Sequence, residues 1–216
     1  ADYVLVTNND VKADLNLISE LVDTADSNDK VGFVIGKVYF YEKKQMLQSV
    51  GKKHDSIYWS AGHIGDREID TGQYDSNQER DWCDDIYWLV SSDLYSKTGG
   101  YDTEFRFQAE DYDWQVRAKK EGFKIFYNYK AKLWHKDSVT IGKNSAFKSY
   151  YDFRNPLIVH MKYRKWSEYK YYLFRKIRML IISSLKSIFN FRFYFLFMSW
   201  KGFLSAIMWG IKNKQK

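Results

Sequence analysis

Short apolar runs alternate with helix-patterned segments over the first 135 residues, and this alternation constrains the fold more than any other feature of the chain. Residues 1–6, 31–41 and 86–90 are rich in Val, Ile, Leu and aromatic side chains, which favour buried strands. Two further strand-like runs, 124–127 and 131–134, follow. Strands that alternate with helices predict an α/β sheet.

The segments between these runs predict helices. Leu15, Ile18 and Val22 recur at helical spacing directly after the first strand-like run. A second, short helix is expected from Ser92. Residues 110–121 have helical character up to a glycine, a residue that often ends helices.

A polar, glycine-dotted stretch at residues 51–80 lacks a sustained period and predicts a long, functional loop. Beyond Tyr150 the sequence becomes compatible with helix and contains few turn signals. Its clearest predicted break is Asn155-Pro156, because the residue before a proline avoids the helical conformation.

Composition excludes several classes of protein. The single cysteine, Cys83, rules out an intramolecular disulfide framework and fits a reducing, cytoplasmic compartment. The 216 residues are 45% hydrophobic, which is enough to bury one main domain with an appendage. The sequence has no Walker or Rossmann glycine loop, no paired-cysteine metal site and no glycine-flanked serine nucleophile, so those enzyme classes are excluded.

Basic charge is concentrated in the last quarter of the chain. Residues 164–216 hold 12 Lys or Arg and one acidic residue, Glu168, whereas the preceding residues carry a net charge of −4. A long apolar run, 193–211, contains Lys201 near its middle, where a cation is costly in lipid. We therefore expect residues 166–216 to form basic amphipathic helices that lie in a membrane interface. The alternatives are a single tilted span, or a helix pair packed on the rest of the chain or on a second subunit.

The same tail argues against nucleic acid as a partner. Its cations are interspersed with large apolar side chains, and the body of the chain is net acidic. That pattern suits a lipid surface better than a phosphate backbone.

Asp10 and His135 are candidate metal ligands. Asp10 follows the first strand-like run, at the kind of sheet edge where ligands bind in α/β proteins. A carboxylate there suits Mg²⁺ or Mn²⁺, and such an ion neutralises the charge on a departing diphosphate. His135 closes the last strand-like run and offers a nitrogen ligand to the same ion. The alternatives are an ordinary polar turn at residues 8–10 and a hydrogen-bonded structural role for His135.

Glu110, Asp111 and Asp113 gather at the start of a predicted helix, where the helix dipole stabilises carboxylates. Asp113 and Arg117 are spaced for an ion pair on one helix face, which favours a structural role. Asp111 points to a different side and is the candidate general base for a hydroxyl group. Ordinary helix-terminal chemistry is the alternative.

Aromatic residues offer candidate sugar-stacking surfaces. Trp82, Tyr101 and Trp114 are such candidates, although aromatic residues near strands more often belong to the core. Trp88 is expected in the core. His63 shows no partner pattern and is assigned no role.

Five motifs occur in a fixed order along the chain. They are Asn8-Asn9-Asp10, Asp70-Thr71-Gly72-Gln73-Tyr74-Asp75, Gly99-Gly100-Tyr101-Asp102, Glu110-Asp111-Tyr112-Asp113 and His135. Together they resemble the family 2 glycosyltransferases of GT-A fold, in the rhamnosyl- and galactofuranosyl-transferase-like branch. The resemblance covers most of residues 1–165. It implies a partial GT-A, Rossmann-like mixed sheet with helices, followed by C-terminal amphipathic helices.

By this resemblance the protein is an inverting glycosyltransferase that moves a sugar from a nucleotide-diphosphate sugar to a lipid-linked or polysaccharide acceptor in surface glycan synthesis. Asp10 matches the aspartate of the metal-binding motif, His135 matches a histidine metal ligand, and the implied cofactor is Mg²⁺ or Mn²⁺. Asp111 matches the base that deprotonates the acceptor hydroxyl. The implied location is peripheral, on the cytoplasmic face of the cell membrane.

The resemblance also suggests residues that bind substrate. These are Asn9, Trp82, Asp84, Asp85, Gly100, Tyr101 and Glu110. Arg154-Asn155 resembles a further family signature to which no role is assigned.

Two features depart from the family pattern. The nucleotide-binding βαβ segment that normally precedes the Asn8 strand is missing, which implies that this fragment alone is inactive and lacks most base and ribose contacts. Asp84-Asp85 replaces a small Ser/Thr-Gly pair, and these carboxylates either contact the acceptor or lie in a solvated loop. A non-catalytic, membrane-bound remnant or partner subunit is the alternative function.

Overall fold

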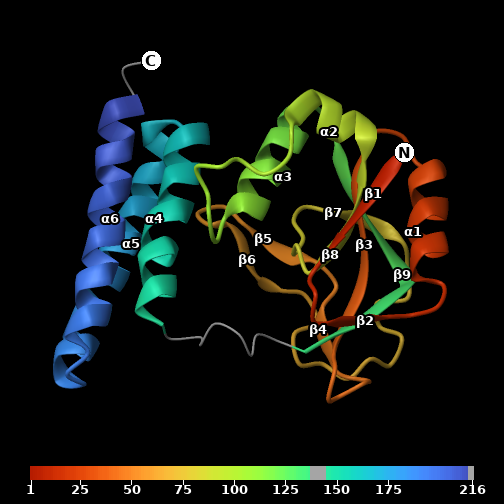
Figure 1. Ribbon diagram of the computed structural model, residues 1–216, viewed down its shortest axis with the longest axis horizontal. Coiled ribbons are helices and arrows are strands. Elements are labelled where there is room, and N and C mark those ends of the chain that lie inside the picture. The colour runs from red at the N-terminus through yellow and green to blue at the C-terminus, as the bar shows by residue number, and fades with distance from the viewer. Residues whose placement is uncertain (137–144, 214–216) are drawn as a thin grey trace. The chain divides into compact units, whose positions relative to one another are not determined.

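The computed structural model describes residues 1–136 and 145–213. It shows a mixed α/β protein in which a seven-stranded, nearly closed, barrel-like mixed sheet is followed by three C-terminal helices (Figure 1). The predicted α/β class is therefore confirmed. The chain forms two compact units: a sheet unit, Ala1–Gly100 with Trp114–Asp137, and a helical unit, Tyr101–Asp113 with Ser138–Lys216. The helical unit thus includes the segment that leads into the predicted acidic helix.

The sheet brings the ends of its parallel strands together at one edge. Its strands are β1 (Tyr3–Thr7), β2 (Val11–Ala13), β3 (Val31–Phe40), β4 (Leu47–Ser49), β7 (Gln78–Arg80), β8 (Tyr87–Ser91) and β9 (Lys124–His135). The order is β1-β8-β3-β9-β2, with β4 on β3 and β7 on β9. Because β1 and β3 both pair antiparallel with β8, and β3 pairs parallel with β9, the strands β1, β3 and β9 run in one direction.

The prediction that residues 51–80 form one long loop is wrong. The segment contains an antiparallel hairpin, β5 (Lys52–Asp55) with β6 (Trp59–His63), and the edge strand β7. These strands are short and mostly polar, so hydrophobic patterning does not reveal them, and backbone pairing decides their structure. The two runs predicted after residue 123 are one continuous strand, β9.

Helices cover both faces of the sheet. Helix α1 (Leu17–Asp26) packs on one face, and α2 (Ser92–Thr98) with the second half of α3 (Glu110–Lys120) packs on the other. Ser91 caps α2, because its hydroxyl accepts a hydrogen bond from the backbone of Leu94. Gly99 ends α2 with a φ of 69°, in the left-handed region that glycine adopts without strain.

The helix predicted from the spacing of Leu15, Ile18 and Val22 is α1. It buries Leu17, Leu21, Thr24 and Ala25, and Val22 packs against the same core cluster. Leu15 lies before the helix and is fully exposed, and Ile18 is 60% exposed.

One of the two core clusters of the sheet unit is rich in aromatic residues and includes the predicted core residue Trp88. Its ring lies 4.5 Å from that of Phe33, and Trp114 meets both rings edge-on. Trp88 and Trp114 are buried, so Trp114 is a core residue and not a sugar-stacking surface. The burial of these large rings fixes α3 against the sheet.

The Asp70–Asp75 motif neutralises a buried lysine. Lys37 lies in β3 and is 1% exposed. Its Nζ donates to Asp70 Oδ2 at 2.6 Å and to Asp75 Oδ1 at 2.5 Å, and the Tyr39 hydroxyl also donates to Asp70. Burial opposes ionisation of Asp70, but the hydrogen bonds from Lys37 and Tyr39 outweigh it and lower its pKa. This motif therefore holds the turn at residues 70–75 on the sheet.

The helical unit contains α4 (Ala146–Tyr163), α5 (Trp166–Phe189) and α6 (Phe193–Asn213). The predicted helix break at Asn155-Pro156 is wrong, because α4 runs through Pro156. Helix α6 lies close against α4 at Gly202, where a β-carbon would stand 2.1 Å from the carbonyl oxygen of Tyr150. Within the residues that the structure describes, no helix combines the length and apolarity needed to cross a membrane.

Candidate functional site

Asp10 and His135 lie side by side at the carboxyl edge of the parallel strands. The register of β2 on β9 places Val11 opposite His135, so Asp10 comes next to the imidazole. The backbone of Lys136 donates to the Asp10 carbonyl at 3.1 Å. His135 Nε2 is 3.2 Å from Asp10 Oδ1, with the His135 side chain buried and that of Asp10 30% exposed. The two predicted ligands are therefore adjacent.

Gln48 on β4 sets the orientation of the His135 ring. His135 Nδ1 lies 3.0 Å from Gln48 Oε1, and because that oxygen accepts only, Nδ1 carries the proton that it shares. In the neutral ring Nε2 then bears the lone pair. Nε2 also lies 3.5 Å from the side-chain nitrogen of Asn8, in the Asn8-Asn9-Asp10 motif.

A lone pair on Nε2 has two kinds of partner within reach: the side-chain amide of Asn8 at 3.5 Å, and a cation shared with the Asp10 carboxylate, which lies 3.2 Å away. A proton on Nε2 is one such cation, and a divalent metal ion is the other. A histidine whose second ring nitrogen donates to a fixed oxygen is the usual arrangement of a metal ligand. The pair therefore fits a divalent cation.

The pair supplies two protein ligands. Among residues 1–136 and 145–213, no group of three or more His, Cys, Asp or Glu side chains gathers in a way that could hold a metal ion. Mg²⁺ is commonly held by one or two side chains, with water and substrate phosphate as its remaining ligands. Two side chains would leave most of the coordination positions of such an ion to other ligands.

A basic cavity lies next to this pair. It has a volume of about 350 Å³, and its lining includes His135, Lys43, Arg67 and Lys136. Three exposed cations against one acidic lining residue, Glu42, make the cavity electropositive. An electropositive cavity attracts anions.

Sequence reasoning missed Gln48 and the three cations of this cavity. Gln48 lies on a three-residue strand, and Arg67 lies within the segment that had been predicted as one loop. Lys136 directly follows His135, and that adjacency was the one signal in the sequence that pointed to it.

Asp84 belongs to a second polar cluster of the sheet unit. It accepts hydrogen bonds from Ser49 Oγ at 2.5 Å and His63 Nδ1 at 3.0 Å, and Lys52 Nζ lies 3.2 Å away. Burial opposes its ionisation, but Lys52 and His63 hold its pKa well below the usual range. Asp84 is thus an ionised anchor for the β5–β6 hairpin, and it does not lie in a solvated loop. Asp85, the next residue, is half-buried.

Trp82 is 4% exposed, so little of its ring is open to a sugar. It stacks on Trp59 with ring centroids 5.9 Å apart, and Lys119 Nζ lies 3.7 Å from its centroid. The Trp82 ring therefore joins the hairpin to α3 by packing.

Asn9 is exposed in the bend between β1 and β2.

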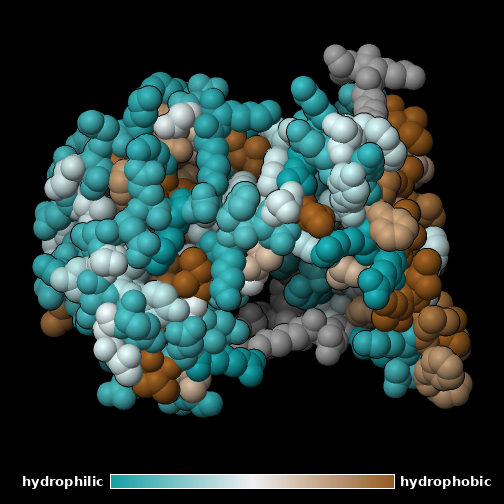
Figure 2. Space-filling view, turned by 180° about the vertical axis from the view of Figure 1, so that it is seen from behind, coloured by the Kyte–Doolittle hydropathy of each residue, from teal (hydrophilic) through white to brown (hydrophobic). Residues whose placement is uncertain are grey.

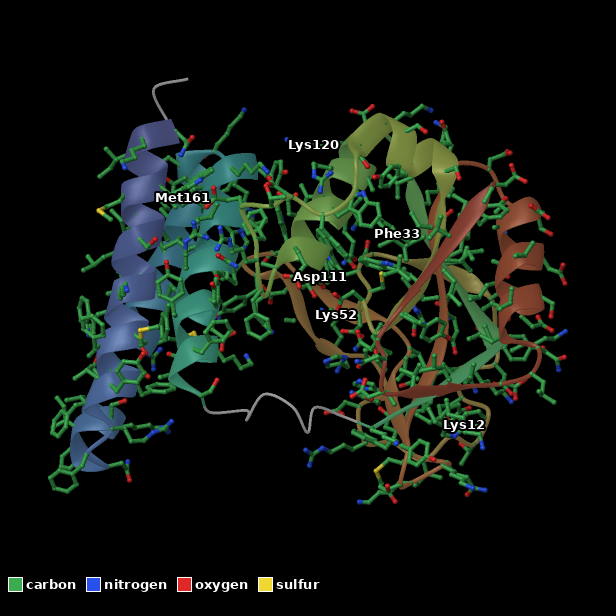
Figure 3. The ribbon with its side chains drawn as sticks, in the orientation of Figure 1. Lys12, Phe33, Lys52, Asp111, Lys120 and Met161 are labelled. Carbon is green, nitrogen blue, oxygen red and sulfur yellow. The ribbon has the colours of Figure 1, made fainter. Side chains whose placement is uncertain are left out.

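The acidic helix start lies in the helical unit. Figure 3 shows Asp111 in the first turn of α3, which also contains Glu110 and Asp113. Burial is the main cause that raises the pKa of Glu110, and the charge of Asp111 adds to it. Among the residues that the structure describes, Glu110 Oε2 is buried with no hydrogen-bond partner. Asp113 accepts hydrogen bonds from Lys162 Nζ and the Tyr163 hydroxyl, which tie α3 to α4.

The Gly99–Asp102 motif begins the connection between α2 and α3. Arg117 donates to the carbonyl oxygens of Thr98 and Gly100, at 2.5 and 2.7 Å. Tyr101 is 39% exposed, and Asp102 accepts from Lys162 at 2.7 Å. Of the residues predicted to bind substrate here, Tyr101 is the most accessible aromatic side chain.

Arg154-Asn155 acquires a structural role. Gln108 and Ala109, directly before α3, have φ values of 67° and 71°, which are strained for residues other than glycine. The buried Asn155 amide donates to the carbonyl oxygens of Phe107 and Gln108 at 2.7 and 2.9 Å. Arg154 bonds to Glu104 in the same segment. The pair therefore stabilises the turn that leads to Asp111.

Comparison with family models and with curated proteins assigns no role to any residue of the site. A scan against protein-family models finds no match, and a search of curated proteins finds none. Adjacent Asp10 and His135, the basic cavity and the ordered motifs of the sequence are the features of the chain that bear on its function.

Proposed function

We propose that the protein is a metal-dependent, inverting glycosyltransferase of partial GT-A architecture, with a nucleotide-diphosphate sugar as donor and a glycan or lipid-linked molecule as acceptor. One observation carries the proposal: Asp10 and His135 stand 3.2 Å apart at the carboxyl edge of the parallel strands, with Gln48 orienting the imidazole. This is the edge at which open α/β sheets bind their ligands.

The residues of the sheet unit would hold the donor. A divalent cation bound by Asp10 and His135 supplies a Lewis acid that stabilises negative charge on the departing diphosphate. Lys43, Arg67 and Lys136 line the adjacent cavity, and their charges attract the two phosphates. The positive charges of Lys43, Arg67 and Lys136 would also stabilise the negative charge that grows on the bridging oxygen as the sugar leaves.

We assign the base to Asp111 on the strength of the motif that contains it. In that motif the aspartate's role is to take the proton of the acceptor hydroxyl that attacks the anomeric carbon. The new bond forms on the face opposite the diphosphate, and the electron pair of the broken carbon–oxygen bond stays on the diphosphate. The anomeric configuration is therefore inverted.

The first experiment measures binding, because binding needs only the sheet unit residues. Mn²⁺ and then pyrophosphate are titrated into the purified chain, with bound Mn²⁺ read by electron paramagnetic resonance. We expect pyrophosphate to bind more tightly with Mn²⁺ than without it, and Asp10→Asn to remove that difference. Asp29→Asn, at an exposed aspartate, is the matched control. Pyrophosphate affinity that is independent of both Mn²⁺ and Asp10 would refute the site.

The second experiment measures transfer from a panel of nucleotide sugars to membrane extract, with this chain alone and with a nucleotide-binding βαβ segment placed before it. Turnover that is lost in Asp111→Asn, with Mn²⁺ binding intact, is the expected result. A folded protein that binds Mn²⁺ and transfers no sugar from any donor would overturn the enzymatic assignment in favour of a non-catalytic role.

A further inference from the structure

Helix α6 has two unlike faces. One side packs on α4 through small residues, including Ser199, Gly202 and Ala206, which are buried. The opposite side carries large apolar residues that are all exposed. They are Phe193, Phe197, Trp200, Leu204, Met208 and Ile211. Their spacing of three, four or seven residues keeps them on one stripe of the helix.

Helix α5 extends this apolar surface. It buries Tyr169, Tyr172 and Leu180 on its inner side. Its exposed stripe is formed by Phe174, Ile177, Ile181, Leu185 and Ile188. The two stripes border one another, because Trp200 Nε1 of α6 donates to Ser184 Oγ of α5 at 2.9 Å. These two stripes together are called the α5–α6 face here, and Figure 2 shows hydrophobic residues gathered along the length of α6.

The turn between the helices is the most exposed part of this surface. Phe189 and Phe191 are each 81% exposed, and Tyr194 is 69% exposed. These rings adjoin the two apolar stripes and enlarge one contiguous apolar surface, and a large exposed apolar patch marks an interaction site. Phenylalanine and tyrosine at such a tip suit the boundary between lipid headgroups and acyl chains.

Charge identifies the kind of partner. Between residues 166 and 213, the exposed ionised side chains are seven cations and one anion, Glu168. The cations are Lys170, Arg175, Arg178, Lys186, Arg192, Lys201 and Lys212. Lys201 and Lys212 stand beside the apolar stripe of α6, and Arg178 lies within that of α5. A protein partner would need a matching acidic and apolar surface, whereas an anionic bilayer offers both properties at once.

We propose that the α5–α6 face is a docking surface for an anionic lipid bilayer. Both helices lie in the plane of the interface, with the apolar stripes and the Phe189–Phe191 tip in the headgroup boundary and the cations against the lipid phosphates. The proposal does not depend on the glycosyltransferase activity, because vesicle binding requires neither donor nor metal. If the activity is present, the face would bring the site to lipid-linked acceptors.

The test is flotation of the full chain with vesicles of phosphatidylcholine alone and of phosphatidylcholine containing about 30% phosphatidylglycerol. We expect binding to the anionic vesicles that weakens at high salt, and at least about tenfold weaker binding to the neutral ones. The double variant Phe197→Ser/Leu204→Ser should lose about tenfold or more of the anionic binding. Leu15→Ser/Ile18→Ser also removes two exposed apolar side chains, one just before α1 and one within it, and should bind like the parent.

A site-specific probe separates insertion from adhesion. An environment-sensitive fluorophore on Leu204→Cys should shift to the blue on anionic vesicles, while the same fluorophore on Leu15→Cys should not, and the native Cys83 is buried. Circular dichroism melting shows that each variant is folded. Equal binding by both double variants would overturn the proposal. So would a concentration-dependent dimer that Phe197→Ser/Leu204→Ser dissociates in the absence of any vesicle binding, because the face would then be covered by a second copy.

Discussion

The buried amide of Asn155 donates a hydrogen bond to the carbonyl oxygen of Gln108 at 2.9 Å, and so ties α4 to the strained turn that precedes α3. A second bond from the same amide reaches the carbonyl of Phe107. Asp111 follows within the first turn of the helix, so the geometry of the acidic helix start depends on a residue more than forty positions later in the chain.

Asn155→Ala should therefore lower the free energy of unfolding by about 1–3 kcal/mol, because it leaves two part-buried carbonyl groups without this donor. Urea denaturation measures this change. Asn213→Ala is the control, since it removes one hydrogen bond of the same kind at an exposed position. Equal stability of the Asn155 variant and the parent would show that water or the backbone satisfies the turn.

Gln48→Ala should weaken Mn²⁺ binding by about tenfold to a hundredfold, because the oxygen that orients His135 is lost. Gln48→Glu keeps an acceptor oxygen and should retain most of the affinity. Titration followed by electron paramagnetic resonance measures both, with the exposed Gln78→Ala as the control. Identical Mn²⁺ affinity in the parent and in Gln48→Ala would indicate that His135 is a structural residue.

Asp70→Ala should cost about 3 kcal/mol of stability at neutral pH, because it leaves the buried Lys37 with the half-exposed Asp75 as its partner. The pKa of Asp70 is lowered in the fold, so its stabilising contribution is present above its ordinary pKa and is lost as the pH falls below that value. As the pH is lowered below the ordinary pKa of aspartate, the variant should consequently lose less stability than the parent. Asp93→Ala, at an exposed ion pair, should change stability by less than about 0.5 kcal/mol. A similar effect of both substitutions would contradict the assigned role of Lys37.

His63→Gln should flatten the pH dependence of stability near neutrality. The hydrogen bond to Asp84 is the main cause that raises the pKa of His63 above 6.5, and burial opposes it. The protonated form therefore stabilises the fold fully below pH 6.5, and this contribution is lost as the pH rises through the higher pKa of the folded state. Melting temperatures at pH 6 and pH 8 should differ by about 2 °C more in the parent than in the variant. His54→Gln serves as the control, and a variant with the parent's pH dependence would assign the effect to another group.

Hydrophobic periodicity predicted the elements whose burial is extensive. The strands β3 and β8 are buried almost throughout, so composition alone marks them. The hairpin β5–β6 and the edge strand β7 are polar, and their hydrogen bonds to other strands leave no pattern in the chain. For the same reason the sequence did not show that α4 continues through Pro156, since packing on α6 sustains a helix that local preference would end.

The residues of the candidate site show the same difference between what local pattern indicates and what only tertiary contacts reveal. Asp10, Asp111 and His135 were named as candidates because their residue types and their order along the chain carry chemical meaning. Gln48 and Arg67 were missed, since a glutamine or an arginine on a polar stretch has no significance until the fold places it beside His135. Likewise, only the fold shows that Asp84, a candidate substrate contact, bonds to Ser49 and His63.

By itself the sequence determined the α/β class and the basic and apolar character of the last helices, and it named Asp10 and His135 as metal-ligand candidates. These follow from burial, charge and residue chemistry, which are local properties of the chain. Tertiary structure alone decided that Asp10 and His135 stand 3.2 Å apart, that Gln48 orients the imidazole and that Asn155 supports the turn before α3. Those relationships join residues that are distant in the chain, and only the register of the strands and the packing of the helices brings such residues into contact.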